Sequence, residues 1–407
     1  MAHPTRSPAV QGIVFLLAAL AALGPFSIDT YLPSFDDIAT SLATTPPAVQ
    51  QTLTAYLLPF ALMTLWHGAI SDALGRRPVI LFNLATFAAA SIGCMLAGSI
   101  EQLWVLRALQ GMTAGAGLVI CRAIVRDLHD GPSAQRLMSR IMILFALAPV
   151  VAPMLGGWLQ VWLGWRAIFA LLVVLSVALW LACWFLLPET LPVDQRQPLR
   201  AGDLLRGYRT VLGARPFLLV CAALAFNFAA FFIYVLSAPT FLMHHLGVSP
   251  TGFLWLSVPA MGGLMIGAWL SGVLAGRLSP RRTVGTAYLV MAGSAALNIA
   301  LNLGGSPGLA WSVLPIFGFT LGMSLAMPSL TLQALDLFPE QRGLAASCQA
   351  FVQAACNALA AGVIAPVVLG STTLLALGMG GLMLLGASAI FVRQRRLGLT
   401  VRVVCLP

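Results

Sequence analysis

Two charged residues, Asp29 and Arg107, carry the chemistry that stands out in this chain. Each lies inside an apolar run long enough to form a membrane-spanning helix. A charge in hydrocarbon costs on the order of 3 kcal/mol even on a lenient insertion scale. Such a charge is tolerated mainly where it faces a water-filled cavity or a partner. A carboxylate and a guanidinium in the same half of a membrane protein therefore indicate a substrate or proton pathway.

The two charges are expected at a similar depth in the membrane. Asp29 comes shortly before the helix-breaking Pro33, and Arg107 follows Glu101 by roughly 9 Å of helix. We predict a contact or a shared cavity, in which Asp29 takes a proton from the outside and Arg107 tunes that equilibrium. The alternative is a solvated Asp29 that caps the next segment. Gln110, one turn from Arg107, would bond to Arg107 or a ligand, or hold helices together.

Composition places the whole chain in lipid. Of 407 residues, 59% are hydrophobic and 8% are charged, whereas soluble domains carry about 25% charged residues. The first apolar run is long and lacks a small-residue cleavage site, so we expect a first transmembrane helix there, not a signal peptide. The seven cysteines show no metal spacing and are expected to pack in the core.

The apolar runs predict an all-α membrane protein with twelve transmembrane helices in two six-helix halves, since a span needs about 20 apolar residues. We expect halves at residues 1–187 and 216–407, the second with a short cytoplasmic tail, joined by a polar cytoplasmic linker at 188–215. The predicted spans are 10–32, 49–70, 78–98, 101–123, 139–161, 165–187, 216–240, 252–276, 283–303, 308–332, 343–368 and 371–392.

The distribution of arginine predicts the orientation. The net charge is +10, and all 22 basic residues are Arg. They cluster in alternate loops, which indicates membrane orientation and argues against a nucleic-acid partner. With the N-terminus inside, the outer segments carry only Arg166, together with Asp36, Asp37 and Glu101. This bias places both termini in the cytoplasm and requires an even number of spans.

The two halves repeat a short motif. Residues 68–77 (GAISDALGRR) follow the second predicted span, and residues 272–282 (GVLAGRLSPRR) follow the eighth. Parallel repeats of six helices related by an axis along the membrane normal are typical of one transporter architecture. Gly276 stands in the second repeat where Asp72 stands in the first.

These segments resemble the major facilitator superfamily. Residues 68–77 resemble its signature loop between helices 2 and 3, in which a small residue lets helices approach, the aspartate caps and pairs, and the arginines hold the cytoplasmic end. Residues 107–111 (RALQG) resemble its proton-coupling motif, and residues 148–157 (APVVAPMLGG) its antiporter motif. The residues that this resemblance marks as conformational are Gly68, Asp72, Gly75, Arg76, Arg77, Pro149, Pro153, Gly156 and Gly157. The prolines would bend a helix that rocks between the halves, or that carries a static kink.

Within the superfamily, the chain resembles the bicyclomycin and chloramphenicol resistance (Bcr/CflA) exporters. Residues 28–33 (IDTYLP), 71–78 (SDALGRRP) and 163–169 (LGWRAIF) carry this likeness. It spans the N-terminal half and is mostly architectural in the C-terminal half. The resemblance implies a major facilitator fold and drug:proton antiport of small amphipathic antibiotics such as chloramphenicol or bicyclomycin. It also implies a monomer in the bacterial inner membrane, with protons as coupling ion and no cofactor.

Uncharged polar and aromatic side chains on two helices are candidates for a substrate cavity. They recur at helical spacing and would otherwise hold helices together. The substrate-binding candidates on these two helices are Asn227, Phe231, Tyr234, Gln349, Gln353 and Asn357, and Gln110 and Tyr31 of the first half join them.

Three other functions stay open. The chain could export or import a native solute such as a sugar or amino acid, although the antiporter-like motif disfavours uptake. A membrane enzyme would need paired acids and bases or metal ligands, and only Asp29 and Arg107 qualify at that depth. A sensor would usually need a soluble signalling domain. The adjacent His244 and His245 are expected at the surface and not at a metal.

Overall fold

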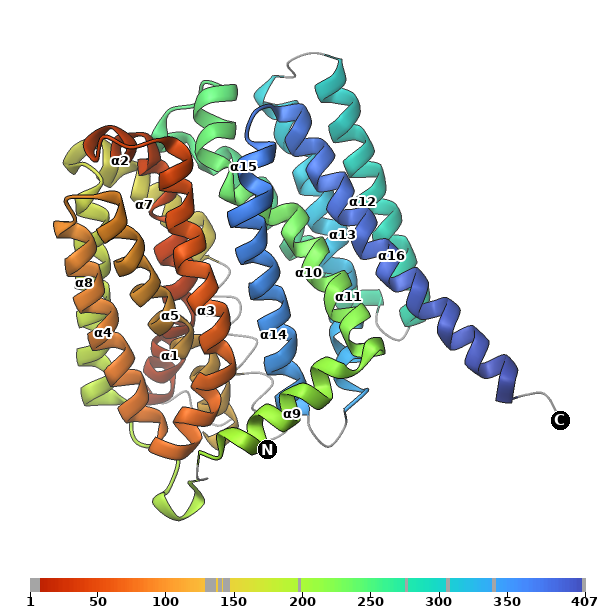
Figure 1. Ribbon diagram of the computed structural model, residues 1–407, viewed down its shortest axis with the longest axis horizontal. Coiled ribbons are helices and arrows are strands. Elements are labelled where there is room, and N and C mark those ends of the chain that lie inside the picture. Colours follow the sequence, from red (N-terminus) through yellow and green to blue (C-terminus); the bar gives the residue numbers. More distant parts are fainter. Residues whose placement is uncertain are drawn as a thin grey trace. The chain divides into compact units, whose positions relative to one another are not determined.

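The computed structural model describes residues 8–128, 137, 141, 147–196, 199–274, 277–304, 308–338 and 342–404, and these residues contain no β-strand. The chain divides into two compact units, Met1–Arg200 and Ala201–Pro407. Figure 1 shows the course of the helices. Gly276 and most of the first third of the predicted span 139–161 lie outside the described residues.

Six long helices build the first unit, and their bounds lie within a few residues of the predicted spans wherever both ends are described. They are α1 (Pro8–Asp29), α3 (Pro46–Leu74), α4 (Arg76–Leu96), α5 (Ile100–Leu128), α7 (Ala148–Leu163) and α8 (Arg166–Leu186). Pro33 interrupts the first span as expected: a 3₁₀ turn (Leu32–Ser34) follows α1, and the short α2 (Phe35–Ser41) follows that turn.

The second unit begins with a helix that the sequence did not predict. This amphipathic α9 (Ala201–Gly213) lies in the segment expected to be a linker. The apolar helices that follow are α10 (Arg215–Leu236), α11 (Leu254–Leu274), α12 (Pro280–Leu303), α13 (Leu309–Leu335), α14 (Arg342–Leu359), α15 (Ala365–Val368) and α16 (Thr372–Val404). Turns of π-helix cover Pro239–His245 and join α14 to α15 over Ala360–Ile364.

The described helices fit a lipid environment. Eleven are long and apolar enough to cross a membrane, and Ala148–Leu163 is a shorter apolar helix. Large apolar side chains such as Phe82, Trp162 and Leu289 are 70–75% exposed on the surface of these helices, which in water would be an aggregation hazard. The prediction of an all-α membrane protein with twelve apolar helices is confirmed.

Two glycines on α5 bring three helices of the first unit close together. A Cβ on Gly111 would overlap the carbonyl oxygen of Tyr56 on α3. A Cβ on Gly117 would overlap the carbonyl oxygen of Leu20 on α1. Helices pack at such short distances only where a residue has no side chain.

Gly68 does not have the role that we expected for it. A Cβ at Gly68 would lie 3.8 Å from Val119 Cγ1, which is ordinary van der Waals distance. The close approach of α3 to α5 therefore depends on Gly111, because that glycine, and not Gly68, faces a backbone carbonyl directly.

The proline and glycine residues of α7 divide into different roles. Pro149 lies in the first turn of α7, where a missing N–H costs no helical hydrogen bond, and Pro153 lies inside the helix. A Cβ on Gly156 would overlap the carbonyl oxygen of Thr30. Gly157 is buried beside it. The structure thus corrects the expectation for Pro149, which starts the described helix instead of bending it, and shows that Gly156 packs α7 against the end of α1.

Candidate functional site

Arg107 lies at the centre of a buried cluster in the first unit. Its side chain is 0% exposed. Its guanidinium carbon lies 4.8 Å from the ring centre of Tyr31 and 4.4 Å from that of Tyr56. A guanidinium between two aromatic faces is held by the negative charge of both ring faces, and this attraction is largest where water is excluded.

Only one of the three nitrogen atoms of this guanidinium donates hydrogen bonds to described residues. Nη1 donates to Gln110 Oε1 at 2.9 Å and to the carbonyl oxygen of Ser27 at 3.4 Å. Nε and Nη2 have no hydrogen-bond partner among the described residues. A buried charged group with free donors is costly, so these two nitrogens are available to an anionic or polar group that enters the site.

Gln110 is used fully inside the protein. Its Oε1 accepts from Arg107, and its Nε2 donates to Ser91 Oγ at 2.7 Å. The Cys94 thiol lies 3.7 Å from the same Oε1. Of the roles predicted for Gln110, the structure shows the hydrogen bond to Arg107. Gln110 therefore fixes the position of the guanidinium.

Asp29 is the last residue of α1 and is 7% exposed. No ion pair joins it to Arg107, although the structure describes both residues. Of the two arrangements that we predicted, a contact or a shared cavity, the contact is therefore absent from this conformation. The guanidinium instead meets the carbonyl of Ser27, two residues before Asp29. Arg107, which belongs to α5, thus contacts the C-terminal end of α1 close to Asp29 but forms no ion pair with that residue.

Tyr31 and Tyr56 are tied to the helices around them. Thr52 Oγ1 donates to the Tyr31 hydroxyl at 3.1 Å. The Tyr56 hydroxyl donates to the carbonyl oxygen of Gly24 at 3.1 Å and lies 2.9 Å from Ser27 Oγ. Both rings are 0% exposed, so the aromatic faces that hold Arg107 are themselves fixed.

In the second unit, the polar residues predicted on α10 bond to α12. Asn227 Nδ2 donates to the Tyr288 hydroxyl at 2.9 Å, and Asn298 Nδ2 donates to the Tyr234 hydroxyl at 2.6 Å. Phe231 packs edge-on against a neighbouring ring of its own helix and is 4% exposed. In this conformation these residues hold helices together, which is the second of the two roles predicted for them.

The polar stripe on α14 is less completely bonded. Gln349 Nε2 donates to Thr331 Oγ1 at 3.2 Å, while its Oε1 has no partner among the described residues. The Oδ1 atom of Asn357 is likewise buried without a partner, and Gln353 between them is half-buried. Free amide oxygens on one helical face are what a ligand with hydroxyl or amide donors would use.

The predicted loop motif forms a charge network at one end of the first unit. Arg76 pairs with Asp72, donates from Nη1 to Ser71 Oγ at 2.7 Å, and donates from Nε to Asp127 Oδ2 at 3.1 Å. Thr190 Oγ1 also donates to Asp127, at 2.8 Å. Asp72 was expected to cap a helix as well, but its described contact is this ion pair.

Glu189 caps the start of α4 from a distant part of the chain. Its carboxylate accepts from the backbone N–H groups of Arg76 at 3.0 Å and Arg77 at 3.3 Å. Gly75 makes room for it with φ +102°, and a Cβ there would clash with Glu189 Oε2. A carboxylate at a helix N-terminus is favoured by the helix dipole. The side chain of Arg77 contacts a different residue: its guanidinium carbon lies 5.3 Å from the ring centre of Trp184.

Sequence reasoning missed several members of these clusters: Tyr56, Ser91, Asp127, Tyr288 and Asn298. For the tyrosines, their small number in the chain was a signal that sequence analysis could have used. The chain has only five, and Tyr31, Tyr56, Tyr234 and Tyr288 all lie within the predicted apolar spans. A hydroxyl in lipid needs a partner. His244 and His245 end a π-helical turn, and His245 Nε2 lies 3.0 Å from the carbonyl oxygen of Leu369.

Apolar helices in two units with charges buried inside one of them define a multi-pass membrane protein. Residues 14–366 match the family model described as Major Facilitator Superfamily. A Bacillus subtilis (strain 168) protein described as an uncharacterized MFS-type transporter, YdgK, is 33% identical over 351 residues, covering 85% of this chain and 87% of that protein. The chain belongs to the major facilitator superfamily, and the resemblance inferred from its motifs is confirmed.

Two further comparisons concern the fold of the chain and its similarity to a resistance protein. A chloramphenicol resistance protein from Pseudomonas aeruginosa is 36% identical over 241 residues, which cover 59% of this chain and 56% of that protein. The crystal structure of a D-xylose-proton symporter matches with a TM-score of 0.75 at 15% identity, covering 94% of this chain and 97% of the other. That likeness to a solved structure shows the fold alone.

Proposed function

We propose that this protein exports small amphipathic antibiotics, such as chloramphenicol or bicyclomycin, in exchange for protons across the bacterial inner membrane. The observation that carries the proposal is Arg107: a fully buried guanidinium, stacked between two tyrosines and left with two free nitrogens, in a unit that also buries Asp29. A stability role alone does not account for this arrangement, because an unpaired charge in lipid is expensive. The names of the resistance relatives support drugs as cargo.

Coupling follows if proton and drug favour different conformations. In our proposal Asp29 binds a proton from the outside, and Arg107 competes for the same carboxylate when it is ionised. Protonation frees the guanidinium, and the helix that carries Asp29 can then move relative to Arg107. The contact of Gly156 with the carbonyl of Thr30 transmits that movement to α7.

The amide oxygens of α14 supply hydrogen-bond acceptors for the drug in this proposal. Gln349 and Asn357 each keep one free oxygen, and Gln353 lies between them. Chloramphenicol and bicyclomycin both carry hydroxyl and amide groups that could donate to such oxygens. Protons are the only coupling agent invoked, a single chain suffices, and both termini lie in the cytoplasm.

The direct experiment measures accumulation of labelled chloramphenicol in bacteria stripped of their own exporters. Cells expressing the wild type should accumulate less drug, and a protonophore should abolish the difference. Asp29→Asn should abolish it too, whereas Asp194→Asn, at an exposed carboxylate of the linker, should behave as wild type. Unchanged efflux by Asp29→Asn would remove Asp29 from the mechanism. No effect of the wild type on chloramphenicol, bicyclomycin and a wider panel of toxins would overturn drug export.

A further inference from the structure

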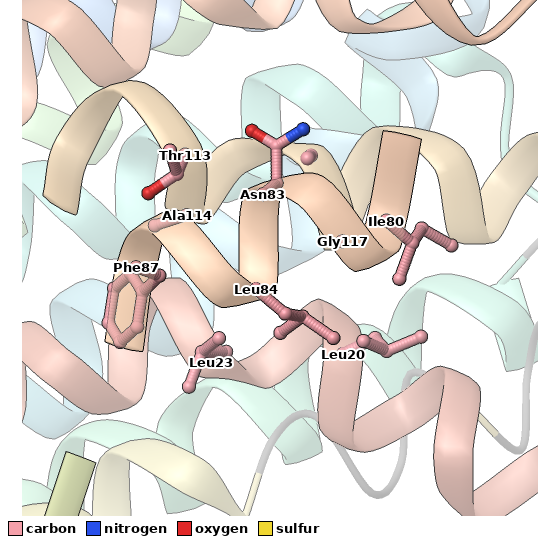
Figure 2. A pocket seen from close by; sticks show the side chains of 10 residues that line it. Leu20, Leu23, Ile80, Asn83, Leu84, Phe87, Thr113, Ala114 and Gly117 are labelled. Atoms are coloured by element: carbon pink, nitrogen blue, oxygen red, sulfur yellow. The ribbon is translucent and has the colours of Figure 1, made fainter. Parts of the chain in front are cut away.

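The cavity between α1, α4 and α5 in the first unit offers little to a further ligand. It has room for about one water molecule, and Figure 2 shows the side chains that line it. Its polar side chains, Asn83 and Thr113, already donate to the carbonyl oxygens of Val79 and Leu109. Charged groups that can still bind a partner lie instead on the surface, and the amphipathic α9 of the second unit carries several of them.

The helix α9 is held at the level where two apolar helices begin. It ends at Gly213, and α10 begins at Arg215 after one extended residue. A Cβ on Gly207, in the middle of α9, would lie 2.9 Å from Leu344 Cδ2 in the first turn of α14. Figure 1 shows α9 crossing the ends of α10 and α14. Since α10, and α14 with its continuation to Val368, are long and apolar enough to span a membrane, α9 lies at the membrane surface.

The side chains of α9 divide into three faces. Tyr208 is buried against the rest of the unit. Leu205 and Arg209, one turn apart on one flank of the helix, are both exposed, Leu205 to 54%. Arg206 and Thr210 are exposed as well, and Thr210 lies roughly 140° around the helix axis from Leu205. A leucine beside an arginine on an uncovered flank is typical of helices that lie in the membrane interface.

The charge of this segment is mainly positive. Residues 201–218 contain three arginines, Arg206, Arg209 and Arg215, and a single acidic residue, Asp203. All three arginines are exposed. A guanidinium binds the oxygens of a phosphate through two nitrogens at once. The surface therefore complements the negative phosphates of anionic phospholipids, and each arginine close to such lipids strengthens binding about fivefold.

We propose that α9 is a binding surface for anionic phospholipids. Leu205 lies at the boundary of the acyl chains, and the long side chains of Arg209 and Arg215 reach the phosphate groups. Leu218, 37% exposed and one turn after Arg215, continues the apolar surface into α10. An acidic soluble partner would also attract the arginines, but it would leave Leu205 in water, so the exposed leucine favours lipid. This surface goes beyond the proposed export and does not depend on it.

The first test locates the two flanks of α9 relative to the lipid. Leu205→Cys and Thr210→Cys, each in the full-length protein, are labelled with a fluorophore and reconstituted in nanodiscs of phosphatidylcholine and phosphatidylglycerol in equal parts. A nitroxide on the lipid, close to the headgroup, quenches a fluorophore that lies in the interface. We expect strong quenching for Leu205→Cys and little for Thr210→Cys. The unmodified protein, labelled in parallel, gives the signal of the native cysteines to subtract. No quenching for Leu205→Cys, or equal quenching for both, would overturn the proposal.

The second test asks whether the charge of the headgroup matters. Amide hydrogen exchange of residues 202–213 is compared between nanodiscs of phosphatidylcholine alone and nanodiscs with equal parts of phosphatidylglycerol. We expect exchange in the wild type to be slower with phosphatidylglycerol by about fivefold or more. The double variant Arg209→Gln/Arg215→Gln should lose this difference. The double variant Arg281→Gln/Arg282→Gln, a matched change at two exposed arginines of α12, should keep it.

Two results of the exchange experiment would overturn the lipid surface. One is equal exchange of α9 in both kinds of nanodisc. The other is slower exchange when inorganic pyrophosphate is added to phosphatidylcholine nanodiscs, without any effect of phosphatidylglycerol, which would assign the arginines to a soluble phosphate. Neither test involves transport, so failure of the lipid surface leaves the export proposal standing, and failure of drug export leaves the lipid surface standing.

Discussion

At the scale of single residues, the chemistry depends on how Arg107 is held. Its charge is balanced by two aromatic faces, one amide oxygen and one backbone carbonyl, and by no carboxylate among the described residues. Cation–π contacts contribute about 2 kcal/mol when desolvated. They leave the guanidinium less tightly bound than an ion pair would, so an ionised Asp29 or a ligand can still compete for it.

Arg107→Lys tests this arrangement. Lysine keeps the charge but loses the planar group that stacks on both tyrosines and the second nitrogen that faces the site. We expect proton-driven efflux to fall at least tenfold, since loss of even one such contact amounts to about 1–2 kcal/mol. The measurement is the initial rate of drug efflux from loaded cells at matched expression. Arg166→Lys, at an exposed arginine, is the control, and wild-type efflux by Arg107→Lys would show that the stacking has no role.

The sequence predicted that Asp29 and Arg107 are buried, but it could not predict their partners. Depth follows from counting residues along a helix, because each residue adds a fixed rise. Rotation of one helix about its axis relative to another is set by packing. Gly111 and Gly117 set it here, and they turn Arg107 toward Ser27 instead of Asp29. For the same reason the sequence left two roles open for Asn227 and Tyr234, a cavity or contact between helices, because a helical stripe shows a face but not what covers it. Asn227 bonds to Tyr288 and also lines a small cavity with Leu224 and Met323.

At the scale of helices, contacts between glycine and backbone determine which elements can move together. Gly156 is the case with a functional consequence, because it joins α7 to the end of α1 directly after Asp29. Gly156→Ala should lower thermal stability by about 1–3 kcal/mol, the usual cost of overpacking, and should slow efflux further if α7 moves with α1.

The matched control for this glycine is Gly293→Ala in α12, where a Cβ meets nothing within 4 Å. That substitution should leave stability equal or raise it by about 0.5–1 kcal/mol, since alanine favours the helix. Both effects can be read as shifts in the thermal unfolding of purified protein. Equal unfolding temperatures for the two variants would contradict the tight contact at Thr30.

The cap that Glu189 forms on α4 leads to a second prediction at the scale of helices. Glu189→Ala removes the carboxylate that accepts from the N–H groups of Arg76 and Arg77 and that lies 3.9 Å from Arg196 Nη2. Losing a cap costs about 1 kcal/mol, so we expect lower thermal stability and faster trypsin cleavage after Arg196 and Arg200. Asp194→Ala, two residues before Arg196 on the same exposed stretch, should be cleaved at the wild-type rate. Equal cleavage of both variants would mean that Glu189 does not secure the linker.

The helices themselves were largely predictable, and the exceptions have physical reasons. Twenty apolar residues in a row leave few alternatives to a spanning helix, and the bounds of α3, α4, α8 and α12 lie within a few residues of expectation. The amphipathic α9 was missed because a segment rich in arginine between two apolar blocks was taken for an irregular linker. Its buried side is formed by Tyr208 and Val211, a pattern visible only when the segment is read at a helical period.

At the scale of the whole molecule, the distribution of arginine predicts the orientation of the chain in the membrane. With the termini in the cytoplasm, every arginine except Arg107 and Arg166 lies in a cytoplasmic segment or at the cytoplasmic end of a predicted span. The reverse orientation would require moving almost all of these charges across the membrane, which the insertion machinery disfavours. Thr45→Cys, at the exposed start of α3, should therefore react with a membrane-impermeant maleimide in intact spheroplasts, while Asp194→Cys should react only after permeabilisation.

The native cysteines require a blank in this labelling experiment. Five of the six described cysteines are buried, and the unmodified protein, labelled in parallel, gives the signal to subtract. Labelling of Asp194→Cys without permeabilisation would invert the topology, and Asp29 would then lie near the cytoplasmic face, where it could not load a proton from the outside. The same measurement thus decides the orientation of the chain and the direction in which its buried carboxylate could drive export.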